Sequence, residues 1–226
     1  MGSLVPWRLN WKPHLSFSLR APPGGSNSGE MHDIWRWRDG TAVLLRAARA
    51  EDGPLLQELV QGLSLQSRYH RFFYPLHELP PDMLARFTQH DPTEAMTLLA
   101  LIRQDDHASA IAMAQYVAEP YPQRCDFAVV VADAWQGAGL GRHLIRTLMC
   151  IARAAGIERI EGDILAENTT MLRLISRMGF TLAGHEDGPY LRKATKTLEV
   201  PEWKCSPLTQ LAARNVHVPR QAQLSR

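Results

Sequence analysis

One segment near the middle of the chain joins an apolar strand to a glycine-rich turn and then to an amphipathic helix. It reads Asp126-Phe-Ala-Val-Val-Val-Ala-Asp-Ala-Trp-Gln136-Gly-Ala-Gly-Leu-Gly141-Arg-His-Leu-Ile. Apolar residues then recur at three- and four-residue steps as far as Ala155, and Gly156 is placed to end the helix. The first N–H groups of a helix are unpaired, and glycines let a ligand approach them closely. The segment therefore predicts a cradle for a phosphate group.

The charges at the start of this helix favour the same interpretation. Arg142 and His143 lie in its first turn, where the helix dipole disfavours cations by a few tenths of a kcal/mol. A helix that carries cations there is suited to an anionic ligand. The alternative is an ordinary strand–turn–helix without a ligand.

Two common phosphate loops fit this segment poorly. A Walker loop requires Gly-Lys-Ser/Thr, which Gly141-Arg-His lacks. The dinucleotide fingerprint requires glycines separated by one and then by two residues, whereas Gly137, Gly139 and Gly141 are evenly spaced. Glu161 and Asp163 lie where a ribose-binding acid would follow, so a dinucleotide site stays open as a weaker alternative.

A third possibility fits better. Gln136-x-x-Gly139-x-Gly141, after an apolar strand and before a helix, resembles the acyl-CoA-binding motif of the GNAT superfamily of N-acetyltransferases. The segment from Leu165 to Phe180 resembles the strand, asparagine, helix and Gly-Phe that follow in that superfamily. The resemblance covers roughly residues 41–200. It implies an α/β fold with a mixed, mostly antiparallel sheet whose splayed central strands are flanked by helices.

Three further segments narrow the resemblance. Ser67–Phe73, Phe87–Asp91 and Met96–Ala100 resemble the acetyltransferase domain of bacterial protein lysine acetyltransferases. The implied function is acetyl-CoA-dependent transfer of an acetyl group to an amine, foremost a protein lysine ε-amine. Two alternatives stay open: acetylation of a small amine such as a polyamine or amino acid, and a non-catalytic acyl-CoA-sensing module.

The implied reaction needs a general base, because a lysine amine with a pKa near ~10.4 is almost wholly protonated at neutral pH. Asp126 is the candidate, since it stands where the relatives carry a catalytic glutamate. It is one methylene shorter, which favours a water relay; the alternative is a solvent-exposed strand end. Many relatives protonate the leaving thiolate with a tyrosine, but Ile175 occupies that position, so water must supply this proton.

The remaining site residues are also implied by the resemblance. Strand N–H groups would hold the thioester carbonyl as an oxyanion site, an interaction worth roughly 3–4 kcal/mol. Asn168 would contact pantetheine or cap the next helix. On the acceptor side we expect His90, Asp91 and Arg71, for which the alternative is polar surface. The expected acetyl-CoA contacts are Val130, Val131, Ala132, Gln136, Gly137, Ala138, Gly139, Leu140, Gly141, Arg142 and Asn168.

Composition sets wider limits. A chain of 226 residues predicts one domain with tails, and a net charge of +2 supports neither a nucleic-acid nor a membrane partner. With 21 Arg and 4 Lys among its 25 basic residues, the chain is typical of a GC-rich bacterial genome. Cys125, Cys150 and Cys205 are odd in number and lack a C-x-x-C spacing. We therefore expect no disulfide, no metal site and a reducing cytoplasm. No oligomeric state follows from the sequence.

The pattern along the chain predicts three regions. Residues 1–40 form a flexible, tryptophan-containing extension and linker, in which Met31 is an alternative start; residues 41–200 form the acetyltransferase domain; residues 201–226 form a loose tail. Strands are predicted over 42–46, 96–102, 110–117, 127–132, 160–165, 180–184 and 190–198. Helices are predicted over 54–63, 81–87, 140–155 and 169–178, with helix or loop over 64–74.

Overall fold

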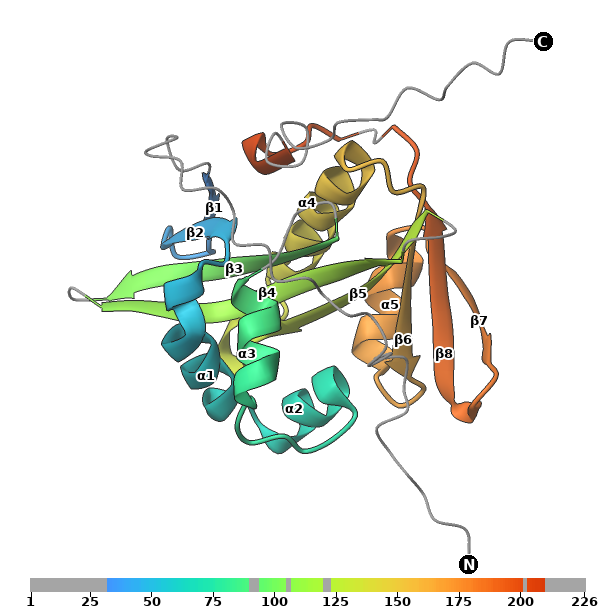
Figure 1. The fold of residues 1–226 in the computed structure, drawn as a ribbon, viewed down its shortest axis with the longest axis horizontal. Coiled ribbons are helices and arrows are strands. Elements are labelled where there is room, and N and C mark those ends of the chain that lie inside the picture. Colours follow the sequence, from blue (N-terminus) through green and yellow to red (C-terminus); the bar gives the residue numbers. More distant parts are fainter. Residues whose placement is uncertain (1–31, 90–93, 105–106, 120–122, 201–202, 210–226) are drawn as a thin grey trace, which may run out of the picture.

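A computed structural model describes residues 32–89, 94–104, 107–119, 123–200 and 203–209. Within these residues, eight strands form one sheet in the order β1-β2-β3-β4-β5-β6-β8-β7 (Figure 1). All neighbouring strands are antiparallel except β5 and β6, which are parallel. The strands are β1 His32–Arg36, β2 Ala42–Ala47, β3 Ala95–Gln104, β4 His107–Glu119, β5 Arg124–Val131, β6 Arg159–Leu165, β7 Thr181–His185 and β8 Gly188–Thr197.

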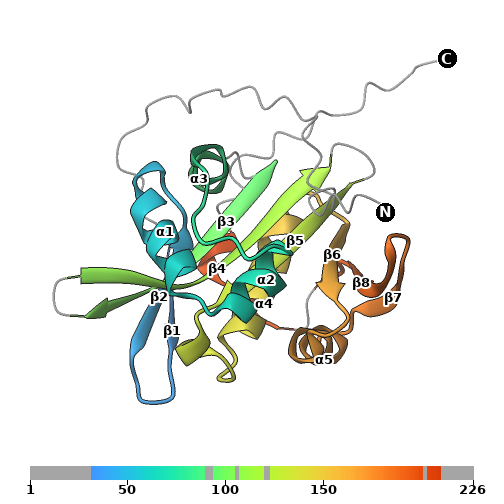
Figure 2. The same cartoon turned by 90° about the horizontal axis from the view of Figure 1, so that it is seen from below.

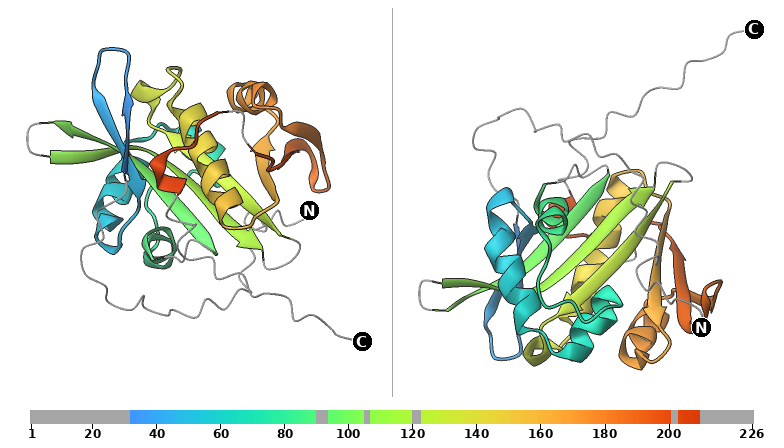
Figure 3. Two further views of the ribbon diagram at one scale, coloured as in Figure 1. Left: turned by 90° about the horizontal axis from the view of Figure 1, so that it is seen from above. Right: turned by 60° about the horizontal axis from the view of Figure 1, so that its bottom comes forward.

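Helices cover both faces of the sheet. The helices α1, α2 and α3 lie over one face of the central strands, and α4 lies over the other (Figure 3). Their bounds are α1 Gly53–Gly62, α2 Leu65–Phe72, α3 Pro81–Thr88, α4 Leu140–Ala154 and α5 Thr169–Arg177; short 3-10 turns are η1 Ala50–Asp52, η2 Asp133–Trp135 and η3 Pro207–Thr209. The observed layers are those of a mixed α/β sheet flanked by helices, as predicted.

Alternation along the strands explains the two layers, because successive side chains point to opposite faces. On β4, Ala112 and Ala114 belong to the core under α4, whereas Met113 belongs to the core under α1 and α3. The amphipathic stripe of α4 supplies Leu144 and Leu148, both fully buried. Both faces are thus packed, which accounts for the near-continuous apolar sequence of the central strands.

The parallel strands β5 and β6 diverge. They pair only over Arg124–Asp126 and Arg159–Glu161, and beyond this point neither strand is paired with the other (Figure 2). Strand β6 continues to pair with β8 along its whole length. The sheet therefore opens at its centre, which is the splay that the resemblance implied.

Most predicted elements are confirmed within a few residues. Gly156 adopts φ +84° just beyond α4, which confirms it as the residue that ends the helix. One element was missed: β1 pairs antiparallel with β2, so residues 32–40 lie in the sheet and not in a flexible extension. Trp35, Arg36, Trp37 and Arg38 alternate between aromatic and charged side chains, a period-two signal for a strand that the prediction did not use.

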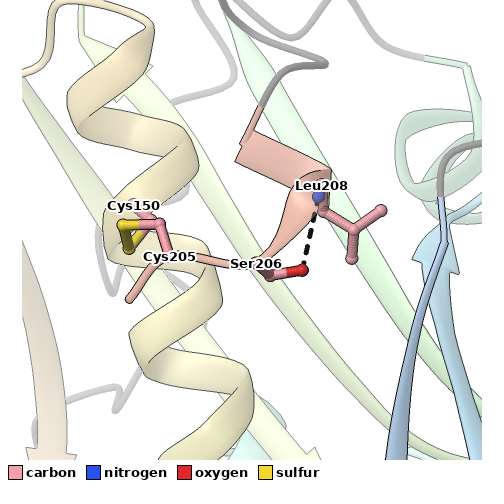
Figure 4. The surroundings of a disulfide bond; sticks show 4 residues. All are labelled: Cys150, Cys205, Ser206 and Leu208. Carbon is pink, nitrogen blue, oxygen red and sulfur yellow. Dashed lines mark hydrogen bonds between the residues drawn. A yellow bond between two sulfur atoms is a disulfide. The ribbon is translucent and has the colours of Figure 1, made fainter. Parts of the chain in front are cut away.

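The C-terminal segment corrects two further predictions. Cys150 of α4 and Cys205 form a disulfide, with Cα atoms 6.0 Å apart and a sequence separation of 55 (Figure 4). Leu208 of η3 is fully buried in the core, and the guanidinium of Arg146 lies 4.9 Å from the centre of the Trp203 ring. Residues 203–209 therefore pack against α4 rather than forming a loose tail. Cysteine spacing could not predict this bond, because tertiary packing brings the two residues together.

Candidate active site

The glycine-rich turn has the backbone geometry that its sequence predicts. Gly137 and Gly139 adopt φ +77° and +98°, a region that other residues rarely adopt, and Gly139 caps the N-terminus of α4. Gly141 is helical, and a Cβ there would make only ordinary contacts, at 3.7 Å, with Leu174 and Val131. The backbone conformation therefore explains the first two glycines, whereas neither conformation nor packing requires the third.

The first turn of α4 carries one fixed positive charge rather than two. Arg142 is exposed, and no carboxylate among the described residues contacts it. Burial lowers the pKa of His143, although Asp33 at 3.5 Å partly opposes this effect. His143 is therefore neutral at neutral pH. A shallow pocket against this turn is lined by Trp35, Ala138, Gly139, Arg142, His143 and Arg146.

The β1–β2 hairpin braces the glycine-rich turn. The side chain of Arg38 donates a hydrogen bond to the carbonyl oxygen of Gly137 at 2.6 Å. The Trp37 ring packs edge-to-face on Trp135 of η2, with ring centroids 4.7 Å apart. Trp35 stacks on His143 at the start of α4, with centroids 6.3 Å apart. Sequence analysis assigned no role to this hairpin, because its partners lie about 100 residues away along the chain.

Only one of the three predicted strand N–H donors points into the opening between β5 and β6. The N–H of Ala132 donates to Ile111 of β4 at 2.8 Å, and Val130 points the same way because alternate residues of an antiparallel ladder bond to one neighbour. The N–H groups of Val129 and Val131 consequently point towards β6, which is unpaired there. Val130 and Ala132 were thus assigned wrongly as donors, and Val129 was missed.

Two predicted acetyl-CoA contacts have structural roles. The side chain of Gln136 donates to Val131 O at 3.0 Å and to Ser67 Oγ of α2 at 3.2 Å. The Oδ1 atom of Asn168 accepts a hydrogen bond from Met171 N–H at 3.1 Å, so Asn168 is the N-cap of α5. The helix-cap alternative for Asn168 is therefore confirmed. Leu140 is buried in the core, which leaves only its backbone for a ligand.

Asp126 lies at the point where β5 and β6 separate. It pairs with Val117 of β4 and with Glu161 of β6, the last residue joined to β5. Burial raises the pKa of the Asp126 carboxyl to about 6, Lys193 lowers it, and the neighbouring carboxylates, among them Asp163, raise it. Such a carboxyl is mostly deprotonated at neutral pH and retains appreciable basicity, which suits a general base. The alternative of a solvent-exposed strand end is wrong.

The carboxylates around Asp126 are neutralised by cations. Asp163 lies 2.6 Å from Lys193 Nζ, and Glu119 lies 2.7 Å from the guanidinium of Arg124. The Glu161 side chain lies 3.9 Å from Arg124 and 4.0 Å from Arg159. Asp126 is therefore the carboxyl of this group for which the described residues provide no direct ion pair.

Three residues were predicted on the acceptor side, and of these the structure describes Arg71. His90 and Asp91 lie outside the described residues. Arg71 lies on α2 and donates to Gln115 Oε1 of β4 at 3.2 Å, beneath the Phe87 ring of α3. Ile175, at the position of the expected acid, is fully buried in the core and has no proton to donate.

The described ranges contain neither a candidate metal centre nor a candidate membrane-spanning helix. No group of three or more His, Cys, Asp or Glu side chains is placed there to hold a metal ion. None of the helices in those ranges is both long and apolar enough to cross a membrane.

A mixed sheet that opens beside a parallel strand pair, with a glycine-rich helix N-terminus next to the opening, is the arrangement that the sequence resemblance implied for an acyl-CoA-dependent transferase. Comparison with known families agrees. Residues 61–180 match the model of the Acetyltransferase (GNAT) family. The chain belongs to this family and is an acetyltransferase of the GNAT type, a class that uses acetyl-CoA as co-substrate.

Individual relatives support the assignment. A Pseudomonas aeruginosa protein named as an acetyltransferase is 31% identical over 142 residues, which cover 63% of this chain and 76% of that protein. The GNAT domain of PAT from S. lividans has a TM-score of 0.66 at 25% identity, covering 74% of this chain and 97% of that domain. Spermidine N-acetyltransferase from Vibrio cholerae, solved with CoA and spermine, is similar in fold, with a TM-score of 0.55 at 18% identity over 69% and 95% of the chains.

Proposed function

We propose that the protein transfers the acetyl group of acetyl-CoA to an amine, foremost the ε-amine of a protein lysine. The observation that carries this proposal is the opening between β5 and β6, which begins at Asp126 and runs towards the glycine-rich turn. The thioester would lie in this opening with its pyrophosphate at the start of α4. Gly141, which the packing does not require, is where a closely approaching ligand would exclude a side chain.

Each step of the proposed acetyl transfer can be assigned to a described residue or to water. The N–H groups of Val129 and Val131 would donate to the thioester carbonyl as negative charge develops on its oxygen. The amine nitrogen attacks the carbonyl carbon, the C–S bond breaks, and the amine proton passes through water to Asp126. Water protonates the departing thiolate, since Ile175 cannot. In this mechanism no acyl-enzyme forms.

The choice of acceptor rests on two observations. The sequence resembles bacterial protein lysine acetyltransferases over three segments, and the fold resembles the GNAT domain of S. lividans PAT. A polyamine site would offer free carboxylates to several amines, but Glu119, Glu161 and Asp163 are paired with cations. A single protonatable carboxyl suits one attacking amine better.

The first experiment is isothermal titration with acetyl-CoA. We expect micromolar binding by the wild type and none by Gly139→Glu, which forces a bulky anion into a left-handed position at the phosphate cradle. Absence of wild-type binding would reject the acetyltransferase site. Asp126→Asn then separates an enzyme from a sensing module: turnover should fall steeply while acetyl-CoA affinity holds.

For the compartment, we propose the cytoplasm. Disulfides rarely persist there, so the Cys150–Cys205 bond provides the test. Thiols alkylated in intact cells and counted by mass spectrometry should include Cys150 and Cys205 if the compartment is reducing. Complete protection of both would place the native protein in an oxidising compartment.

A further inference from the structure

Arg71 of α2 is a cation that no carboxylate among the described residues contacts. It bonds to Gln115 of β4 and lies near the Phe87 ring of α3. The helices α1, α2 and α3 cover one face of the central strands (Figure 3). The Arg71 guanidinium lies 4.8 Å from the centre of the Phe72 ring and 5.8 Å from that of Phe87. Its one hydrogen-bond partner among the described residues is the neutral amide oxygen of Gln115. Burial lowers the pKa of Arg71 to about 10, so the side chain stays charged at neutral pH.

Two neighbouring donors at this place are unsatisfied. Neither Arg71 Nε nor Gln115 Nε2 is exposed to solvent, and neither has a hydrogen-bond partner among the described residues. Gln115 is only 4% exposed. A buried donor without an acceptor is costly, and no anion among the described residues accepts a hydrogen bond from this pair.

The two donors lie beside the proposed reaction centre. Gln115 pairs with Ala128 of β5, and Asp126 precedes Ala128 by two residues on the same face of that strand. Gln115 and Asp126 are thus diagonal neighbours across β4 and β5, a spacing over which long side chains share a ligand. The N–H of Val129, which points into the opening, comes directly after Ala128.

We propose that Arg71 and Gln115 bind a carboxylate carried by one of the two reactants. This inference rests on the proposed function for the place of acyl transfer. Guanidinium forks match carboxylate geometry better than an ammonium does, which accounts for arginine at this position. The carboxylate belongs either to the acceptor, beside its amine, or to a dicarboxylic acyl chain on CoA. Acetyl-CoA with a simple amine would leave both donors unsatisfied.

Matched probe pairs test this proposal and separate the two sources. L-lysine and cadaverine differ only by a carboxylate and represent the acceptor; succinyl-CoA and propionyl-CoA differ in the same way and represent the acyl donor. Each probe is titrated calorimetrically into the wild type and into Arg71→Met, with the acceptor pair measured both without and with saturating CoA. Arg71→Lys, which keeps the charge but not the fork, should retain part of the preference. Arg173→Met is the control, because Arg173 lies on α5 and bonds only within its own helix.

We expect the wild type to bind the carboxylate member of one pair about ten-fold or more tightly, and Arg71→Met to lose that preference. Preference within the lysine pair assigns the carboxylate to the acceptor, and preference within the succinyl pair assigns it to the acyl chain. Equal binding within both pairs, or a preference that survives Arg71→Met, would overturn the proposal. If Arg71→Met does not fold, Gln115→Met replaces it, with a several-fold loss expected. Failure of the proposed function is distinct, since acetyl-CoA itself would then not bind the wild type.

Discussion

Asp126 of β5 and Glu161 of β6 form the last residue pair that joins these strands before they diverge. The proposed base therefore lies at the closed end of the central opening, where the sheet still holds its backbone from both sides. Burial raises the pKa of its carboxyl to about 6. The candidate base with a raised pKa thus lies at the residue pair where the strands begin to diverge.

The pH profile of turnover should report Asp126. A base is active when deprotonated, so kcat/KM should rise with pH through about 6, reach a plateau above it and be lost as the pH falls. Replacing Lys193 by Met removes a cation that lowers the pKa of Asp126, so the rising limb should move to higher pH. Initial rates measured between pH 5 and 9, in buffers of constant ionic strength, check both expectations.

The matched control for Lys193 is Lys196→Met. Lys196 lies three residues further along β8 and bonds to the carbonyl oxygen of Gly179, away from Asp126. Its removal should leave the pH profile unchanged. Asp126 would be excluded as the titrating group if the rising limb of the pH profile does not move in Lys193→Met. The same holds if the limb moves equally in Lys196→Met.

Removing Arg38 should weaken acetyl-CoA binding without unfolding the protein. Its hydrogen bond to Gly137 O orders the glycine-rich turn in the conformation that the cofactor would meet. A net hydrogen-bond contribution of ~0.5–1.5 kcal/mol corresponds to a loss of affinity of about three- to ten-fold for Arg38→Ala. Titration calorimetry measures the affinity, and thermal unfolding checks the fold. Arg36→Ala is the control, since Arg36 bonds only to Gly40 within the hairpin; equal losses in both variants would contradict a specific role for Arg38.

A methyl group at Gly162 of β6 should destabilise the sheet where it opens. A Cβ there would lie 2.7 Å from the Phe127 ring and 3.2 Å from the Phe127 carbonyl oxygen, so the strands must shift to admit it. Overpacking of this kind costs roughly 1–3 kcal/mol. Chemical denaturation of Gly162→Ala measures the loss. Gly184→Ala on β7, where a Cβ meets nothing within 4 Å, should be nearly neutral; a stable Gly162→Ala would show that β5 and β6 separate easily.

Breaking the Cys150–Cys205 bond should lower the melting temperature. The bond closes a loop of 55 residues, and the loss of such a cross-link costs roughly 2–4 kcal/mol, or about 5–15 °C for a domain of this size. Cys205→Ser and reduced wild type should melt at the same lower temperature. If reductant leaves the melting temperature of the wild type unchanged, the bond does not contribute to stability in solution.

Local patterns predicted the elements of this fold well. The apolar stripe from Leu140 onward and Gly156 at its end gave α4, because both signals lie in adjacent residues. The two segments that resemble GNAT motifs predicted the order of strands and helices. This order in turn predicted a mixed sheet. Ile175 stands where the resemblance expects a tyrosine acid, and the sequence alone shows that its side chain has no proton to donate.

Features that depend on distant residues escaped prediction. Trp35 and Trp37 were predicted to belong to a linker. In the structure they pack against His143 and Trp135, which lie about 100 residues away along the chain. Val129 was missed as a donor, and Ala132 chosen wrongly, because the direction of an N–H follows from which neighbour the strand pairs with.

The sequence by itself determined the class of protein, since the glycine-rich turn and its flanking strand and helix are contiguous and their backbone conformations are local. Only the tertiary structure decided which groups face one another: Asp126 and Lys193, Arg71 and Gln115, Cys150 and Cys205. The physical reason is that pKa values, unsatisfied donors and cross-links depend on distances across the sheet. Those distances are set by strand pairing and helix packing, which join residues far apart in the chain.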